Sequence, residues 1–322
     1  MSRLTAHKPF KPWRNFAEQL EALSSKGLEI DNESKALEYL ERLGYYRLSG
    51  YLYPFRELNS SASSANHAPL RLSQFRESAK FHTAVELYVF DKKLRILALD
   101  ALERIEMAVR VDIAYLLGQK DPLAHKNPSL LHGHFSKQIK VRGPAKGKTM
   151  HQVWLEKYES MLHRARKEPF VEHHQQVYGD LPIWVAIEVW DFGLMSKMYE
   201  GMKFADRDSI AEKYGAKDRD EFADWLKSFN FIRNVSAHHS RLWNINILER
   251  SSVPNYLEGF NLNNEKPFLY FCLMKKMLDT ICPNSSWWNR FINLTESFPE
   301  DASVSIKLED LGVVPGWQLW NV

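Results

Sequence analysis

The sequence predicts an all-α protein, and two observations support this fold class. Apolar residues recur at steps of three or four along several long segments, which is the spacing of one helix face. Strand patterns are few, because VSIKL at 304–308 is short and no alternating segment stands beside it as a partner. Hydrophobic residues form 44% and charged residues 26% of the 322-residue chain, the balance of a globular protein with ample core.

Two short helices are expected near the start of the chain, over residues 15–26 and 32–43. Gly27 is placed to end the first helix, and Asn32 is placed to cap the second. The aromatic stretch YYRLSGYLYPF (45–55) follows, and its glycine and proline argue against a continuous helix. After it, the polar segment SSASSANHAP has the composition of a flexible loop.

The strongest helical pattern covers residues 83–118. Unbroken, such a helix would span about 54 Å, so we expect a break or bend within it. Acid-to-arginine pairs four residues apart support the pattern in the favourable orientation. We expect the pair at 106 and 110 to lie on the helix surface, with a role in positioning catalytic groups as the alternative. The pairs are Asp91–Arg95, Asp100–Arg104 and Glu106–Arg110.

The rest of the chain continues the helical pattern. We divide it into an N-terminal helical region (1–80), a helical bundle (81–300) and a C-terminal tail (301–322). Three tryptophans at core spacing are expected to be structural, namely Trp184, Trp190 and Trp225. The further helices are expected over 151–167, 183–200, 205–214, 219–242, 267–281 and 285–296.

Composition narrows the class of protein and its compartment. The formal net charge of +3 is too small to demonstrate a polyanionic partner. Cys272 and Cys282 are too few for a disulfide framework or a cysteine-based zinc site, which fits a reducing compartment. No leader segment and no membrane-spanning run is evident. We therefore expect a cytoplasmic protein with no membrane partner.

One segment is locally cationic. From Pro122 to Leu155 there is no acidic residue, and the Gly, Pro and Lys content of KQIKVRGPAKGK is typical of a mobile loop. Lys137, Lys140 and Arg142 of this loop are candidates for contact with an RNA backbone. The alternative, a solvated linker that limits aggregation, has equal weight.

The segment FIRNVSAHHSRLW (231–243) contains the candidate catalytic pair, Arg233 and His238. It lies near the expected end of a helix, and the neighbouring side chains are polar, which is unusual for a simply buried segment. A histidine can take or give a proton near neutral pH, and an arginine can hold phosphate oxygens as negative charge builds. The three supporting polar neighbours are Asn234, His239 and Arg241.

The spacing of this pair sets a geometric condition. On a regular helix five residues separate two side chains by about 140° around the axis and about 7.5 Å along it. Arg233 and His238 therefore meet at one target only if the arginine bends round, the helix is distorted, or two copies face each other across a two-fold axis. Asn234, four residues before His238, is placed to hydrogen-bond the imidazole and select its tautomer.

The pair suits attack of a ribose 2′-OH on the adjacent phosphodiester without a metal. DNA lacks the 2′-OH and would not be cleaved. A structural arginine and histidine are the alternative. We reject a zinc site at either HisHis dipeptide, because adjacent side chains on a helix do not converge, and we expect no cofactor. Tyr46 and Arg47 could stack a base and bind phosphate, although packing of the N-terminal helices is the first expectation for the aromatic ring.

RNVSAHHSRLWN closely resembles the signature of the Abi-like (abortive infection) family. That family belongs to the HEPN superfamily of α-helical RNases, which is defined by an arginine, four to six intervening residues and a histidine. KALEYLERLGYYRLSGYLYPF, LERIEMAVRVDIAYLLG and LPIWVAIEVWDFGLMSKMY resemble the family's N-terminal, long-helix and central-helix blocks. These blocks run in family order from about residue 15 to 245, and the part from about 250 is less distinctive.

The resemblance implies a HEPN-type helical bundle with a smaller helical N-terminal region. It implies a toxin-like endoribonuclease for phage defence that leaves a 2′,3′-cyclic phosphate and a 5′-OH, with Arg233 and His238 catalytic and Asn234 the polar residue that follows the arginine. Because the sequence has one such motif, a homodimer with a composite active site is implied. A small noncoding RNA or an antitoxin is a further partner to consider. A non-catalytic RNA-binding or phage-sensing scaffold is the alternative function.

Overall fold

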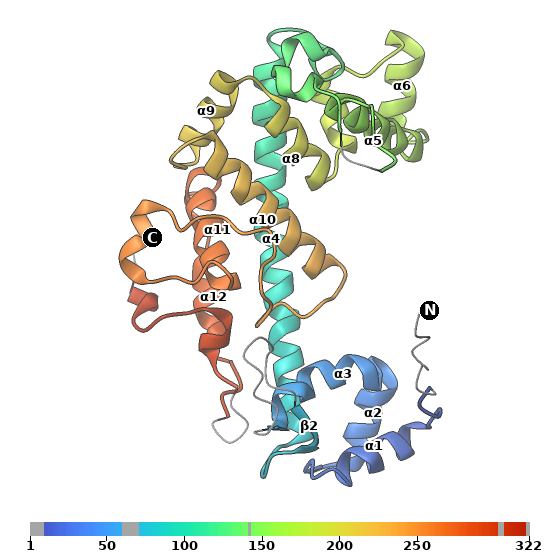
Figure 1. Cartoon of the computed structure of the whole chain (residues 1–322), viewed down its shortest axis with the longest axis vertical. Helices are drawn as coiled ribbons and strands as arrows, with labels where there is room; N and C mark the ends of the chain where they lie inside the picture. Colours follow the sequence, from blue (N-terminus) through green and yellow to red (C-terminus); the bar gives the residue numbers. More distant parts are fainter. Residues whose placement is uncertain (1–9, 60–70, 141–142, 302–305, 320–322) are drawn as a thin grey trace, which may run out of the picture. The chain divides into compact units, whose positions relative to one another are not determined.

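In the residues that the structure describes, the chain is all-α, as expected, apart from one small sheet that was not predicted. This computed structural model describes residues 10–59, 71–140, 143–301 and 306–319. Two compact units make up the fold: one holds the described residues up to Lys92 and those of 296–308, and the other holds 93–295 and 309–319. The boundary between the units falls within the long helix α4 (Phe81–Gly118), labelled in Figure 1, whereas the expected ranges assign all of it to the bundle.

The first unit contains α1 (Phe16–Ser24), α2 (Glu33–Leu43) and α3 (Tyr45–Leu52). Asn32 caps α2, because its side chain accepts a hydrogen bond from the backbone N–H of Lys35 at 2.9 Å. After α1, Gly27 adopts a φ of 89°, a conformation that favours glycine. The apolar faces of these helices form the core of the unit with side chains including Leu23, Leu40, Leu48, Phe55 and Phe75.

The aromatic stretch 45–55 is not one continuous helix, as expected, but its glycine does not interrupt it. Helix α3 runs through Gly50 and ends ahead of Pro54, so only the proline interrupts it. An antiparallel pair of strands, β1 (Arg56–Leu58) and β2 (Arg71–Phe75), also went unpredicted. These strands span three and five residues and are largely exposed, so they lack the alternation that marks a half-buried strand.

The expected break in the long helix is absent. Helix α4 extends over 38 residues, and a sharp kink normally needs a proline, a glycine or an inserted group. The helix has no proline, and its one glycine is its last residue, Gly118. Its apolar stripe is buried along its length, by residues that include Leu87, Leu94, Ala101, Ile105, Val109 and Ile113.

The second unit surrounds helix α10 (Arg219–Ala237), which packs against α8, α9 and α11 (Figure 1). The other helices of this unit are α5 (Met150–Arg164), α6 (Pro169–Tyr178), α7 (Ile183–Ala186), α8 (Phe192–Gly201), α9 (Phe204–Lys213), α11 (Pro267–Ile281) and α12 (Trp287–Thr295). Short 3-10 helices cover Tyr53–Phe55, Ala124–Lys126, Pro128–Leu130, Gly133–Ser136, Ile187–Val189, Asn255–Phe260, Leu308–Leu311 and Trp317–Leu319. Within the described ranges, no helix combines the length and the apolar character needed to cross a membrane.

The second unit corrects three expectations. The helix expected over 183–200 is interrupted at Trp190, and helix α6 was not anticipated. The helix expected over 219–242 stops at Ala237. Trp190 and Trp225 are buried as expected, but Trp184 is 52% exposed and is therefore not a core residue.

Candidate functional site

The end of helix α10 separates the two candidate catalytic residues. Arg233 lies within the helix, whereas His238 is its C-cap. His239 takes a left-handed conformation with a φ of 58°. Its N–H donates to the carbonyl of Ser236 at 3.1 Å, and the next N–H, of Ser240, donates to Val235 at 2.9 Å. This is the Schellman arrangement, which usually places glycine at the left-handed position, so the helix stop carried no glycine signal in the sequence.

The segment beyond the helix is held in place by buried groups. Leu242 and Trp243 are fully buried. The guanidinium of Arg95, a buried side chain of α4, donates to the carbonyl of Ser240 at 3.5 Å. Arg241, one of the expected supporting residues, is half-buried. The position of the turn that carries His238 is therefore defined by the fold of the second unit.

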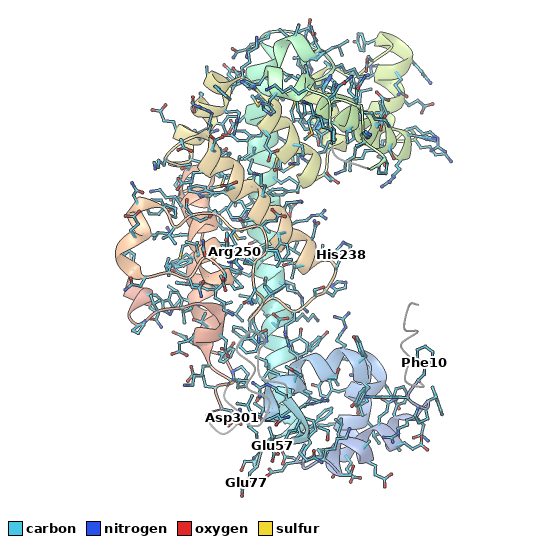
Figure 2. The ribbon with its side chains drawn as sticks, in the orientation of Figure 1. Phe10, Glu57, Glu77, His238, Arg250 and Asp301 are labelled. Carbon is cyan, nitrogen blue, oxygen red and sulfur yellow. The ribbon has the colours of Figure 1, made fainter. Side chains whose placement is uncertain are left out.

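The side chain of His238 points out from the end of α10 into solvent (Figure 2). None of the described residues hydrogen-bonds its ring. The expected bond from Asn234 to the ring does not form, and the amide oxygen of Asn234 accepts from Arg233 at 3.4 Å. His238 is thus open to solvent, with a backbone N–H bonded to the carbonyl of Asn234 at 3.0 Å and an imidazole available to a ligand.

Arg233 lies in the wall of a pocket of about 520 Å³. Helix α4 contributes Glu106 and Arg110 to this pocket. The helix interruption before α8 contributes Trp190 and Asp191. His238 is not among the lining residues. Since α10 is regular through Ala237, the divergence of about 140° expected for this spacing persists within one chain. A local distortion of the helix is therefore not what aligns the pair.

Glu106 and Arg110 form a buried ion pair, not the surface pair that was expected. Their side chains are only 13% and 11% exposed, and the guanidinium of Arg110 also donates to the carbonyl of Trp190. Burial raises the pKa of the Glu106 carboxyl, and the positive charges of Arg110 and Arg233 act against that rise. Glu106, Arg110 and Arg233 line the same pocket, and a role of the Glu106–Arg110 pair in positioning the catalytic groups stays a prediction.

The interruption before α8 shapes the pocket and was missed from the sequence. Trp190 leaves the helical conformation, and its carbonyl becomes available to Arg110. Asp191 then caps α8 by accepting from the N–H of Leu194 at 2.6 Å, and it also pairs with Lys157 at 2.8 Å. An aspartate at the start of an apolar helical pattern is an N-cap signal that could have located this break.

Two lysines of the acid-free segment 122–155 are paired with acids that lie outside this segment, which the composition of the loop did not indicate. Backbone hydrogen bonds join the two sides of its described part. Lys126 pairs with Asp180 at 2.7 Å, and Lys148 also has a carboxylate partner. Lys137 and Lys140 are exposed, and no acidic partner for them is found in the described part of the chain. Arg142 lies outside the described residues.

In the first unit, Tyr46 is 91% exposed, so its ring does not pack the N-terminal helices together. Arg47 is exposed beside it in the sequence. Both residues are accessible to a partner, which is what RNA contact requires.

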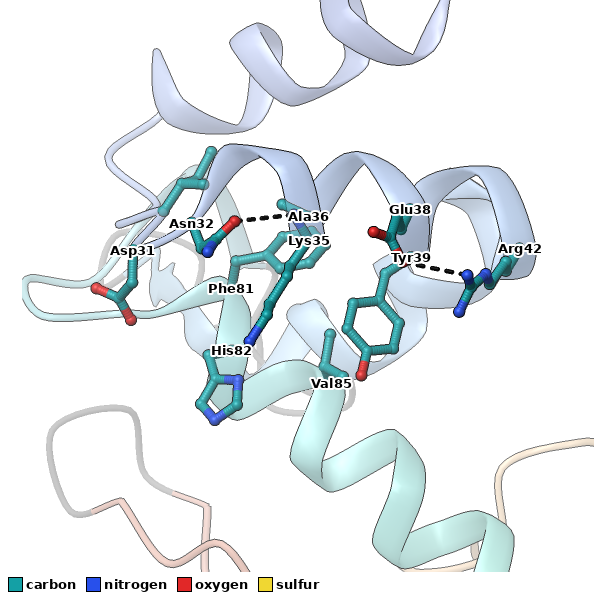
Figure 3. A pocket seen from close by; sticks show the side chains of 11 residues that line it. Asp31, Asn32, Lys35, Ala36, Glu38, Tyr39, Arg42, Phe81, His82 and Val85 are labelled. Atoms are coloured by element: carbon teal, nitrogen blue, oxygen red, sulfur yellow. Dashed lines mark hydrogen bonds and ion pairs between the residues drawn. The ribbon is translucent and has the colours of Figure 1, made fainter.

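A second pocket, of about 470 Å³, lies between α2 and the start of α4. Lys35 and Tyr39 extend from α2 toward His82 and Val85 of α4 (Figure 3). Arg42 pairs with a glutamate of its own helix at 3.2 Å, and His82 does the same at 3.1 Å. Because an acid of α2 balances Arg42, we do not assign this pocket to RNA.

The HisHis dipeptides do not form a metal centre with other ligands in the described ranges, where no three potential ligands gather. In the dipeptide of α6, the ring of His174 is bonded to the carbonyl of Phe170 at 2.7 Å. The metal-free mechanism remains a prediction.

A family model described as Abi-like protein matches residues 38–244, which is well over half of the chain and includes Arg233, His238 and the Glu106–Arg110 pair. No curated protein and no solved structure matches the chain.

Proposed function

The chain belongs to the Abi-like protein family, the family named for abortive infection, and from this premise we propose that it is a metal-independent endoribonuclease of the HEPN type. In this proposal it acts as a toxin-like effector that cuts RNA in the infected cell. The observation that carries the proposal is the placement of Arg233 in a pocket wall and of His238, exposed, at the end of the same helix.

The chemistry follows from these two groups. One imidazole takes the proton of a ribose 2′-OH, whose oxygen attacks the adjacent phosphorus. The bond from phosphorus to the 5′ oxygen breaks, and a protonated imidazole gives its proton to that leaving oxygen. The products are a 2′,3′-cyclic phosphate and a 5′-OH. Arg233 stabilises the charge that builds on the non-bridging oxygens, and its forked guanidinium suits two of them at once.

A second copy of the chain supplies what one copy lacks. The base and the acid of this mechanism are two imidazoles, and within one chain His238 diverges from the pocket of Arg233. Two copies related by a two-fold axis would bring two arginines and two histidines to one cleft. The active site in this proposal is therefore composite and forms in a homodimer.

An exposed apolar face of α4 fits such a dimer. Met107, Val111 and Tyr115 lie four residues apart on one side of the helix and are 38%, 54% and 68% exposed. This face adjoins the pocket, because the sulfur of Met107 contacts the guanidinium of Arg110 at 3.7 Å. Apolar faces of this kind mark sites of association. In sedimentation experiments Val111→Glu should give a monomer, while Leu248→Glu, at an apolar position exposed elsewhere, should not. If the Val111→Glu variant still forms a dimer, this face of α4 is not part of the interface.

The catalytic assignment is tested with labelled RNA in EDTA. Arg233→Ala and His238→Ala should each slow cleavage by about 100-fold or more, the range for removal of an acid–base or oxyanion group. Arg233→Lys should recover little activity, because an ammonium cannot bind two oxygens in the same way. His173→Ala, at an exposed histidine of α6, is the matched control and should cut normally. Equal cutting by all four variants would refute the assignment.

A non-catalytic RNA-binding or phage-sensing scaffold is the second candidate, and the exposure of Tyr46 favours it. An RNA-binding scaffold would retain RNA intact, and growth arrest of infected cells would be unchanged by His238→Ala. Tyr46→Ala would then weaken RNA retention. A phage-sensing scaffold would show no RNA affinity at all. A small noncoding RNA or an antitoxin that copurifies with the protein would be the partner in either case.

A further inference from the structure

The pocket beside Arg233 contains two carboxylates that its ion pairs do not use. Glu106 is engaged by Arg110, and Asp191 by Lys157 and the cap of α8. Two further acids also line the pocket. Glu168 precedes α6, and Glu188 lies in the 3-10 helix that precedes Trp190. Both are exposed, and neither has a hydrogen-bond or ion-pair partner for its side chain in the described part of the chain. They are acceptors available to a ligand.

The same pocket offers a ring and two cations. Phe170 of α6 is half-buried and lines the pocket, so its ring can support a stacked base. Arg164, at the end of α5, joins Arg233 in the lining and can share a phosphate with it. The volume of about 520 Å³ is within the range of small-ligand pockets and accommodates a nucleotide.

Unpaired carboxylates discriminate among the four bases by hydrogen bonding. An ionised carboxylate only accepts hydrogen bonds. Guanine presents two adjacent donors, N1–H and the N2 amino group, that one carboxylate can receive together. Adenine and cytosine present one amino group beside an acceptor nitrogen, and uracil presents one N–H between two carbonyl oxygens that a carboxylate repels. Two acceptors on the pocket wall therefore match guanine best and uracil worst.

We infer that this pocket is a base-specificity site for guanine, in which Glu188 and Glu168 bind the Watson–Crick edge, Phe170 stacks on the base, and Arg233 and Arg164 bind the attached phosphate. The inference rests on the proposed ribonuclease function and names the substrate preference of that site. It predicts that cleavage occurs next to guanosine.

Calorimetric titration with mononucleotides tests the site independently of cleavage. The full chain should bind 3′-GMP about tenfold more tightly than 3′-UMP, the effect of one good bidentate contact. Inosine 3′-monophosphate, which lacks the N2 amino group, should bind with intermediate affinity. The double variant Glu168→Gln, Glu188→Gln should bring the ratio of GMP to UMP affinity close to one. Glu212→Gln, at an exposed glutamate outside the pocket, is the matched control and should keep the ratio.

Arg233→Ala separates the two halves of the nucleotide. It should weaken both mononucleotides by a similar factor and leave their ratio unchanged, because it removes a phosphate contact. Equal affinity for GMP and UMP, a ratio that survives the double glutamine variant, or no binding of either mononucleotide would overturn the inference. RNA cleavage without guanosine preference would overturn it and leave the ribonuclease proposal standing. Selective binding of GMP without any RNA cleavage would do the reverse.

Discussion

His125 makes the second unit sensitive to acid. Its side chain is fully buried, and its ring lies 5.3 Å from the ring of Tyr158 and 6.3 Å from those of Trp154 and Trp190. Neither ring nitrogen has a hydrogen-bond partner among the described residues. Burial lowers the pKa of this imidazole from 6.5 to about 4, so it is neutral in the folded protein at pH 7. Lys126 next to it has the same effect.

The sign and size of the effect follow from this pKa. Because the unfolded chain keeps an ordinary histidine pKa of 6.5, it binds more protons than the folded chain between pH 6.5 and pH 4. The free energy of unfolding therefore falls as the pH decreases through this window. A full shift from 6.5 to 4 corresponds to about 3 kcal/mol, at 1.36 kcal/mol per pH unit. Between pH 7 and pH 4.5 the loss due to His125 is about 2 kcal/mol.

The substitution His125→Phe isolates the contribution of His125 to the free energy of unfolding. It keeps a ring of similar size and removes the titrating group. Urea unfolding followed by tryptophan fluorescence gives the free energy of unfolding at pH 7 and at pH 4.5. The variant should lose about 2 kcal/mol less than the wild type between these pH values, and the carboxylates that titrate in both proteins cancel in the comparison. His173→Phe, at an exposed histidine, should show the wild-type loss. An equal loss in His125→Phe and the wild type would refute the reasoning.

Three further predictions concern the pocket and the loop. Glu106→Gln should lower the free energy of unfolding by about 2 kcal/mol, because the buried guanidinium loses its counter-charge; an unchanged urea midpoint would contradict this. Asp191→Ala should cost about 1 kcal/mol through loss of the α8 cap, whereas Asp191→Asn, which can still cap, should cost less in the same assay. Replacing Lys137 and Lys140 with glutamine should reduce the slope of log RNA affinity against log salt by about 1.4, and an identical slope would exclude the loop from the RNA contact.

The elements that the sequence predicted well are those whose signals are local. Helices α1, α2, α9 and α11 have regular apolar spacing, and the cap at Asn32 and the glycine at Gly27 are single-residue signals. Long periodic segments also predicted α4 and α10. However, α4 lacks the expected break, and α10 ends at Ala237 and not at residue 242. The break expected in α4 rested on length alone, and length does not bend a helix that packs along its whole stripe.

The candidate site was predicted only in part, because its geometry depends on contacts between distant segments. Arg233 and His238 were identified from a short motif. The buried environment of Glu106 and Arg110 depends on the carbonyl of Trp190, 80 residues further along the chain from Arg110. No local pattern encodes that contact. Glu168 is the N-cap residue of α6, which was not anticipated, and Glu188 lies inside the helix expected over 183–200. Both are exposed acids, so nothing in the sequence distinguished them from other surface acids.

The left-handed turn at His239 determines how the motif tolerates changes in length. Arg233 precedes this turn and is fixed by the packing of α10, whereas His238 is the last residue before the chain reverses direction. One residue inserted between them would rotate the imidazole by about 100° and advance it by about 1.5 Å relative to the guanidinium. A change of length between Arg233 and His238 would therefore alter the angle between the two side chains, whereas a substitution there would not.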